Sequence, residues 1–303
     1  MRTNSIQIKC GSLLVNDLQV STKLYSELLE QEIVEQGELS EILATSWGAP
    51  RLAGAKTCLL QPKSKADSYI RLIQSPDIVT PIPHATSYGW TAFEICVEDV
   101  FALADKLQGS GFSIVGPPKH LDGMTNVIPM QVVGPDQEVL FLNQVLESDS
   151  HTDLPIAQSV VDRIFIAVLA TNDRQSSVLD YAQQLACQEA GTYELRYSLI
   201  NRAFDLDMET KHSLTLVQDG RKPLLEIDQY PAEAKERMVK PGNISHGNAI
   251  VSLLVDDLDT LPLRNKVSEH TVCAQGLLYE GRRSIMTRGA AGELLELIEK
   301  PSN

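Results

Sequence analysis

The stretch that decides the fold is Leu13-Leu14-Val15-Asn16-Asp17-Leu18, an apolar run that ends in an acidic turn. The pattern returns as Ile95-Cys96-Val97-Glu98-Asp99-Val100 and as Leu253-Leu254-Val255-Asp256-Asp257-Leu258, and a looser copy is Ile164-Phe165-Ile166-Ala167-Val168 followed by Asn172-Asp173. Each run is rich in β-forming residues, and the Asn or Asp that follows is typical of a helix cap. The pattern therefore predicts four copies of one strand-to-helix unit.

A second string closes each copy. It reads Tyr69-Ile70-Arg71-Leu72-Ile73, Leu140-Phe141-Leu142, Leu224-Leu225-Glu226-Ile227-Asp228 and Leu294-Leu295-Glu296-Leu297-Ile298. The distance from the acidic turn to this string alternates long, short, long, short, which one duplication of a pair of units would explain. We predict four βαβββ units, at about residues 6–76, 88–146, 160–231 and 246–300.

The fold class follows from this repeat. It is α+β, with four βαβββ modules paired into two curved mixed-sheet domains, because a single unit leaves an apolar sheet face uncovered. The alternating spacing favours pairing between neighbours, so that an N-terminal domain spans residues 1–147 and a C-terminal domain spans residues 160–303. The polar stretch at 148–159 has no periodicity and is the expected linker.

Composition restricts the class of protein. The chain has 303 residues, 43% of them hydrophobic, and a formal net charge of −14. Without a dense Lys/Arg stripe, this charge argues against binding to nucleic acid. We also expect no contact with a membrane, because no apolar window has the length of a spanning helix and the N-terminus lacks a signal peptide. The five scattered cysteines indicate reduced thiols, so we expect a cytoplasmic protein. Because the units can pair within one chain, we expect a monomer or a homodimer, and the expected partner is a small-molecule ligand.

The chain resembles the vicinal oxygen chelate superfamily, which contains glyoxalases, bleomycin-resistance proteins and extradiol dioxygenases. The resemblance rests on the strand-to-helix signature, on Tyr25 and Tyr181 in the following helices, and on the Gly-Pro-Asp and Gly-Ala-Ala-Gly-Glu sequences before the last strands of the short units. It covers roughly residues 6–145 and 160–300, and it implies the four-module architecture of the two-domain members.

The resemblance also implies where a metal would bind. Metal-binding members place a ligand, usually His, about seven residues before the Asp of the first turn, and a Glu in the middle of the last strand. Counting in this chain gives Cys10, Ala92, Ile166 and Ile250 at the first position, or Arg163 in the third unit if residues 169–172 are an insertion. The second position holds Arg71, Phe141, Glu226 and Glu296. We therefore expect a degenerate site with no metal and no other cofactor, and the alternative is a divergent metal-dependent dioxygenase that recruits His212 or His246.

Glu226 and Glu296 are the predicted catalytic residues. If both faced one apolar cleft, repulsion and burial would raise the pKa of at least one, as general acid/base catalysis requires. This predicts a metal-independent lyase or isomerase that acts on a small oxygenated compound, aromatic or polycyclic, by carboxylate acid/base catalysis. One alternative pairs either Glu with Arg163, Arg282, Arg283 or Arg288 in a structural role. Another is a non-catalytic protein that sequesters a small molecule, as bleomycin-resistance proteins do.

Further residues are candidate substrate contacts. An inward Arg71 would hold a carboxylate or enolate oxygen, and the alternative is a strand residue that points to solvent. Trp47 and Trp90 would form an aromatic wall and Tyr230 a hydrogen-bond donor, with plain packing as the alternative for each. His212, which could lie near Glu226, is a further candidate, and so is Arg163. Lys119 and His120 are candidates because they belong to the turn-rich loop at 116–123, which could fold over the N-terminal cleft. Cys10 is expected to be a buried, inert thiol.

Overall fold

A computed structural model gives the fold and describes residues 5–120, 125–148 and 152–301. The first unit comprises β1 (Gln7–Val15), α1 (Leu18–Glu27), β2 (Gln31–Glu38), α2 (Glu41–Ser46), the 3-10 turn η1 (Pro50–Leu52), β3 (Lys56–Pro62) and β4 (Tyr69–Gln74). After the turn η2 (His84–Thr86), the second unit comprises β5 (Gly89–Val97), α3 (Val100–Leu107), β6 (Ser113–Gly116), β7 (Val127–Val133) and β8 (Val139–Val145).

The second half of the chain repeats this order. The third unit comprises β9 (Val161–Thr171), α4 (Arg174–Leu185), β10 (Gln188–Arg196), α5 (Ser198–Ala203), β11 (Lys211–Asp219) and β12 (Lys222–Gln229). The fourth comprises β13 (Gly247–Val255), the 3-10 turn η3 (Leu258–Thr260), β14 (Val272–Cys273), β15 (Arg283–Arg288) and β16 (Leu294–Glu299). The long spacing of the first and third units is therefore accounted for by α2 with η1, and by α5.

The acidic turns cap the elements that follow them. The side chain of Asp17 accepts hydrogen bonds from the backbone N–H groups of Gln19 and Val20, and Asp99 and Asp173 cap α3 and α4 in the same way. These contacts confirm the predicted helix starts. In the fourth unit Asp257 caps only the turn η3, because Pro262, close behind it, disfavours helical backbone at the residue before it.

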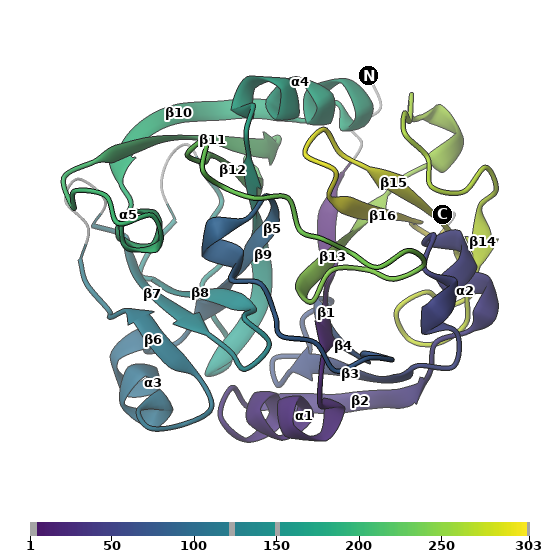
Figure 1. The fold of residues 1–303 in the computed structure, drawn as a ribbon, viewed down its shortest axis with the longest axis horizontal. Coiled ribbons are helices and arrows are strands. Elements are labelled where there is room, and N and C mark those ends of the chain that lie inside the picture. The colour runs from purple at the N-terminus through teal and green to yellow at the C-terminus, as the bar shows by residue number, and fades with distance from the viewer. Residues whose placement is uncertain (1–4, 121–124, 149–151, 302–303) are drawn as a thin grey trace.

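The sheets do not correspond to the two halves of the chain. The two eight-stranded sheets have the orders β14-β15-β16-β13-β1-β4-β3-β2 and β10-β11-β12-β9-β5-β8-β7-β6. The first unit thus shares a sheet with the fourth, and the second shares one with the third. Figure 1 shows this pairing, because the purple strand β1 lies beside β13 of the fourth unit, and β5 of the second unit lies beside β9 of the third. The fold class is as predicted, but pairing within residues 1–147 and within 160–303 is wrong.

The physical reason is that the first strands, not the chain neighbours, join the units. β1 pairs antiparallel with β13, and β5 pairs antiparallel with β9. The connecting segments between the first and second units and between the third and fourth cross from one sheet to the other, where Ser87 forms a bridge with Lys235. The expected linker at 148–159 joins two units of the same sheet, and residues 149–151 of it lie outside the described part of the chain.

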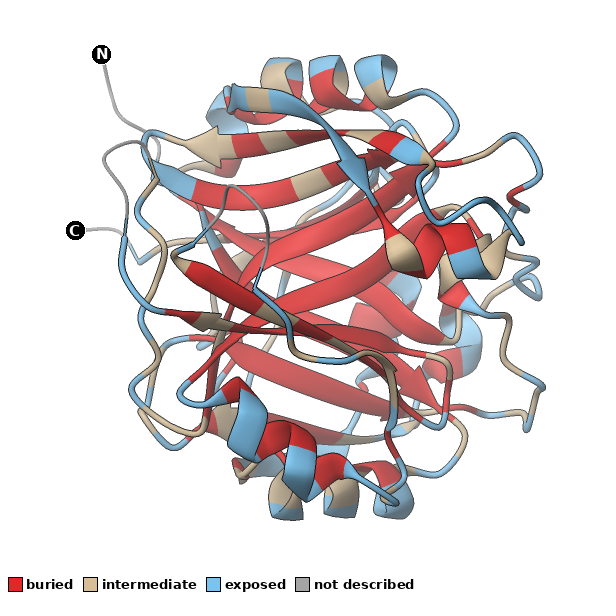
Figure 2. Cartoon of the chain, turned by 90° about the vertical axis from the view of Figure 1, so that its left-hand side faces the viewer, coloured by how far each residue is buried: buried red, intermediate tan, exposed pale blue. Residues whose placement is uncertain are grey.

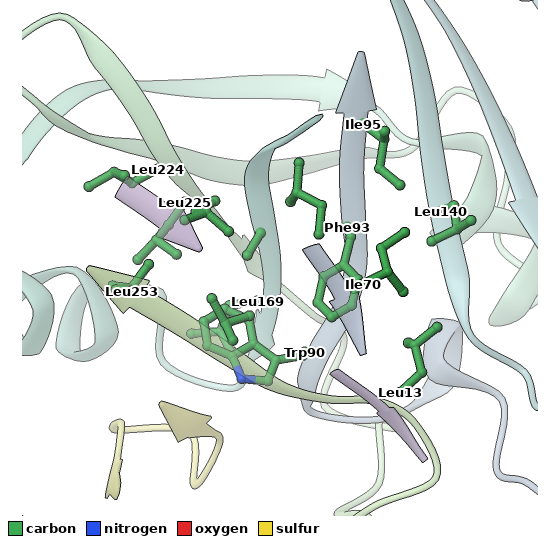
Figure 3. Packing of buried hydrophobic residues seen from close by; sticks show 14 of the residues in the cluster. Leu13, Ile70, Trp90, Phe93, Ile95, Leu140, Leu169, Leu224, Leu225 and Leu253 are labelled. Atoms are coloured by element: carbon green, nitrogen blue, oxygen red, sulfur yellow. The ribbon is translucent and has the colours of Figure 1, made fainter. Parts of the chain in front are cut away.

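The main core lies between the two sheets and extends under α1, α3 and α4. Side chains from both sheets meet there, among them Leu13, Ile70 and Leu253 from one and Trp90, Phe93 and Leu169 from the other (Figure 3). Strands are mostly buried, whereas the helices expose their outer sides (Figure 2). The opposite face of each sheet carries a second, smaller core, covered by α2 in one sheet and by α5 in the other. None of the described helices is long and apolar enough to cross a bilayer.

Candidate functional site

The pairing of strands identifies the residues at the centre of each sheet. These residues lie on the outer face, which points away from the other sheet. The middle residue of each closing strand pairs with a residue of the first strand of its own unit: Arg71 with Ser12, Phe141 with Glu94, Glu226 with Val168, and Glu296 with Ser252. In every unit the residue paired with the closing strand lies two positions after the one that the sequence analysis reached by counting back seven residues from the Asp. In the second unit the sequence analysis therefore identified Ala92 and missed Glu94. The available signal was that Glu94 is the single charged residue within β5.

Two sites result, one in each sheet, and Glu226 and Glu296 do not share a cleft. The 1–4 site, between the first and fourth units, contains Cys10, Ser12, Trp47, Arg71, Ser252, Tyr279 and Glu296. The 2–3 site, between the second and third units, contains Glu94, Phe141, Asn143, Tyr197, Glu226, Asp228 and Tyr230. The expectation of one carboxylate pair is wrong because it depended on pairing the third unit with the fourth.

A buried ion pair occupies the centre of the 1–4 site. Arg71 Nη2 lies 3.3 Å from Glu296 Oε2, and the two side chains are 6% and 1% exposed. Arg71 also donates from Nε to Ser12 Oγ at 3.0 Å and from Nη1 to the Tyr279 hydroxyl at 2.6 Å. Arg71 thus points inward rather than to solvent. The partner of Glu296 is therefore Arg71 and not one of the surface arginines. Arg283 binds Asp259 and Glu299, and Arg282 binds Glu280.

Glu296 is fully engaged by donors. Oε1 accepts from Trp47 Nε1 at 3.0 Å and from Tyr279 Oη at 2.7 Å, and Oε2 accepts from Ser252 Oγ at 2.6 Å in addition to Arg71. The indole of Trp47 also stacks on the guanidinium, 4.4 Å from ring centroid to Cζ. A carboxylate with four donors and 1% exposure is placed to fix Arg71 and Tyr279 rather than to take a proton from a substrate.

A cavity of about 330 Å³ leads to this network. Arg71 and Tyr279 line it, together with apolar side chains that include Leu39, Leu43 and Leu59. The candidate Cys10 is buried beside the network, where burial raises its pKa to about 11, so that it remains a thiol. This agrees with the expected inert role.

The 2–3 site has the opposite character, because acidic groups gather there without a counterion. Glu226 and Asp228 project from the same face of β12, and Glu94 lies across β9 from them. No ion pair to Glu226 occurs among the described residues. Burial, and then the charge of Glu226, raises the pKa of Glu94 well above its ordinary value. Burial also raises the pKa of Asp228, with the charges of Glu226 and Glu94 adding to it.

Glu226 is the accessible member of this group. Its side chain is partly exposed, whereas Glu94 is 7% and Asp228 1% exposed. Burial raises the pKa of Glu226 to about 7, although a hydrogen bond from the Tyr197 hydroxyl at 3.1 Å acts in the other direction. Asn143 donates to Glu94 at 2.5 Å, and Tyr230 packs edge-on against Phe204 in the same core. The site therefore holds a carboxyl that changes charge near neutral pH.

Three further candidates, Trp90, His212 and His246, do not lie at the centre of either site. Trp90 is 1% exposed in the core between the sheets and donates to the Leu294 carbonyl, so it lines neither site. His212 contacts Asn201 of α5 at 2.6 Å and lies four residues along β11 from Leu216, the partner of Glu226. His246 contacts Ser75 at 3.1 Å, near the connecting segments.

The remaining candidates lie at the surface. Arg163 is partly exposed beside Asp162. Lys119 and His120 are exposed, and the ring of His120 lies 6.5 Å from that of Phe101 in α3, outside both sites. Residues 121–123 of the loop that was expected to cover a cleft lie outside the described part of the chain.

The residues of neither site suit the metal that the fold family implies. A guanidinium stands at the carboxylate position of the 1–4 site, and Glu296 has no oxygen left for a cation. The 2–3 site has no imidazole, and within the described residues no group of three or more His, Cys, Asp or Glu side chains is arranged to hold an ion. We therefore derive no step that passes through a metal.

No family model and no curated protein sequence matches the chain. Solved structures do: glyoxalase I from Zea mays, 14% identical, superposes with a TM-score of 0.60 over 98% of this chain and 93% of its own. A proposed dioxygenase from Bacillus subtilis, 12% identical, superposes with a TM-score of 0.57 over 98% of this chain and 86% of its own. The chain thus has the four-module fold of the vicinal oxygen chelate superfamily.

Proposed function

We propose that the protein is a metal-independent lyase or isomerase whose 2–3 site moves a proton on a small oxygenated compound, with Glu226 as the catalytic acid/base. The observation that carries the proposal is the partly exposed Glu226 carboxyl, whose pKa is raised to about 7 by burial. A general base works best when its pKa lies near the working pH, because it is then ionised often enough and still basic enough.

The neighbours of Glu226 support this role. Burial raises the pKa of both Glu94 and Asp228 well above the ordinary value, and the charge of Glu226 adds to each shift. Each of the two carboxyls therefore favours its protonated form when Glu226 is ionised. Burial, and then the charges of Asp228 and Glu226, raises the pKa of Tyr197 far above its ordinary value, so its hydroxyl stays a hydrogen-bond donor. Phe141 and Tyr197, with ring centroids 6.2 Å apart, give the site an aromatic wall.

The proposed step is proton abstraction from a carbon next to a carbonyl group. The Glu226 carboxylate takes the proton, and the electron pair of the broken C–H bond forms an enolate. As Glu226 takes the proton it no longer needs the hydrogen bond from the Tyr197 hydroxyl, and this O–H then donates to the oxygen on which the charge develops. Return of the proton at another position gives an isomerase, and loss of a group from the neighbouring carbon gives a lyase. We expect the enzyme to work in the cytoplasm, where its five free cysteines stay reduced.

The test measures proton transfer without knowledge of the natural substrate. Small aromatic ketones and 2-oxo acids are incubated with the protein in D2O, and exchange of the proton next to the carbonyl is followed by NMR. Wild type should catalyse exchange of at least one compound, and the exchange should fall about 100-fold or more in Glu226→Gln. Glu27→Gln, an equal change at an exposed position of α1, is the control.

Two results would contradict the proposal. One is that no compound exchanges faster than in buffer, which would leave ligand sequestration as the function. The other is that Glu226→Gln exchanges as fast as wild type, which would place the base elsewhere.

A further inference from the structure

The 1–4 site contains a binding site that is separate from the proposed catalytic group. Its cavity of about 330 Å³ falls in the range that accommodates a small organic ligand. The exposed side chains of Ile42 and Cys273 belong to the lining, and Leu39, Leu43, Leu59 and Leu278 give it a mainly apolar surface beside the polar Ser40, Thr57 and Gln275. The ligand body that fits this lining is therefore apolar.

Arg71, which lines the cavity and is taken as its floor, retains hydrogen-bond donors without a partner among the described residues. Each terminal nitrogen of Arg71 carries two N–H groups. Among the described residues, Nη1 donates only to Tyr279 and Nη2 only to Glu296, which leaves one N–H on each nitrogen without a partner. Ser12, Glu296 and the stacked indole of Trp47 hold the guanidinium in place. A ligand oxygen that reaches the floor meets donors that are already oriented.

The charges around the cavity select against an acid. The charge of Arg71 is balanced by Glu296, so the floor has no net positive charge. The entrance carries the exposed carboxylates Glu35 and Glu38, and within the part of the chain that the structure describes no cation other than Arg71 lines the cavity. An anionic ligand would meet two negative charges and no uncompensated positive one. A neutral acceptor gains the same hydrogen bonds without this repulsion.

We propose that the 1–4 site binds a neutral carbonyl compound with an apolar body, such as a ketone, ester or quinone, with the carbonyl oxygen on Arg71. This binding needs no catalytic group and takes place in the other sheet from Glu226. It therefore stands or falls independently of the proposed proton transfer.

The experiment compares two probes of nearly the same shape, 2-acetylnaphthalene and 2-naphthoate. Their binding is measured by titration calorimetry on the full chain. Occupancy is measured in parallel as slower modification of Cys273, the one exposed cysteine of the five, by a thiol reagent. Wild type should bind the ketone, which should protect Cys273, and should bind the carboxylate several-fold more weakly, because the negative charges of Glu35 and Glu38 repel it.

Three variants make the test specific. Glu35→Gln/Glu38→Gln, at exposed positions, should remove most of the difference between the probes, and Glu27→Gln/Glu147→Gln changes net charge equally elsewhere and should not. Thr57→Trp fills the cavity from β3 and should abolish binding of the ketone. Tighter binding of the naphthoate by wild type would overturn the ligand class. Absence of saturable ketone binding, or binding that Thr57→Trp leaves unchanged, would overturn the site.

Discussion

Removal of one partner from the Arg71–Glu296 pair should unfold the protein at markedly milder conditions. In Glu296→Gln, the amide keeps one acceptor oxygen and places an NH2 group against donors that now bind a carboxylate, namely Trp47, Tyr279, Ser252 and Arg71. The guanidinium also loses its counterion at a position that is 6% exposed. Breaking a buried pair on one side costs roughly 3–5 kcal/mol of unfolding free energy.

The double variant separates the pair from its surroundings. Arg71→Met alone leaves the Glu296 carboxylate buried and uncompensated, and it should cost a similar amount. In Arg71→Met/Glu296→Gln no buried charge remains, so we expect the loss to be smaller than the sum of the single losses by about 2 kcal/mol or more. The control is Lys63→Met, which removes one partner of an exposed pair with Glu30 and should cost less than about 1 kcal/mol.

The assay is urea unfolding followed by circular dichroism, with the free energy obtained by linear extrapolation. The Tm of Glu296→Gln should be lower than that of wild type by roughly 10 °C, because each kcal/mol of lost stability lowers the Tm by about 2–4 °C in domains of 150–250 residues. Two outcomes would refute the reasoning: a Glu296→Gln variant within about 1 kcal/mol of wild type, or a double variant whose loss equals the sum of the single losses. Either would mean that water, and not the protein, compensates the charges.

Three further predictions concern the rest of the molecule. Burial raises the pKa of Glu138 to about 8, and that of Glu226 to about 7. Because the folded state holds these protons more tightly than the unfolded state, the stability they contribute is present at low pH and is lost as pH rises through those values. Urea unfolding should therefore give less stability at pH 9 than at pH 7, by about 1.4 kcal/mol from Glu138 and a few tenths of a kcal/mol from Glu226, and Glu138→Gln should flatten most of this dependence. Greater stability at pH 9 would contradict the prediction. Brief treatment of the native protein with iodoacetamide should modify Cys273 alone by mass spectrometry, because the other four cysteines are buried, and a second rapid adduct would show that a site opens in solution. Gly11→Ala should destabilise the protein by roughly 1–3 kcal/mol in the same unfolding assay, because its Cβ would lie 2.5 Å from the ring of Phe93 in the other sheet, and an unchanged midpoint would mean that the sheets adjust freely.

Local features of the fold could be predicted because they depend on neighbours in the chain. The acidic turn at Asp17 and its copies supplies both the end of a strand and the cap of the next element, so four units were evident without tertiary information. The buried position of Cys10 and the cap at Asp257 followed in the same way. The loss of the fourth helix departed from the repeat, and Pro262 was the signal for it. The added helices α2 and α5 of the two long units departed from it as well.

The composition of the candidate sites depended on contacts between distant residues. Whether Glu296 meets Glu226 or Arg71 is decided by the pairing of β1 with β13, and both arrangements satisfy the same apolar patterns. Glu94 was missed because it, and not the counted residue Ala92, pairs with Phe141 of β8. The two residues are two positions apart in β5, so their side chains lie on the same face of the sheet and alternation does not distinguish them. Repeats and alternation define which face of a strand is buried, but nothing in them specifies the partner strand. The tertiary structure therefore decided which charges meet, and with them the contrast between a compensated pair in one sheet and an uncompensated acidic cluster in the other.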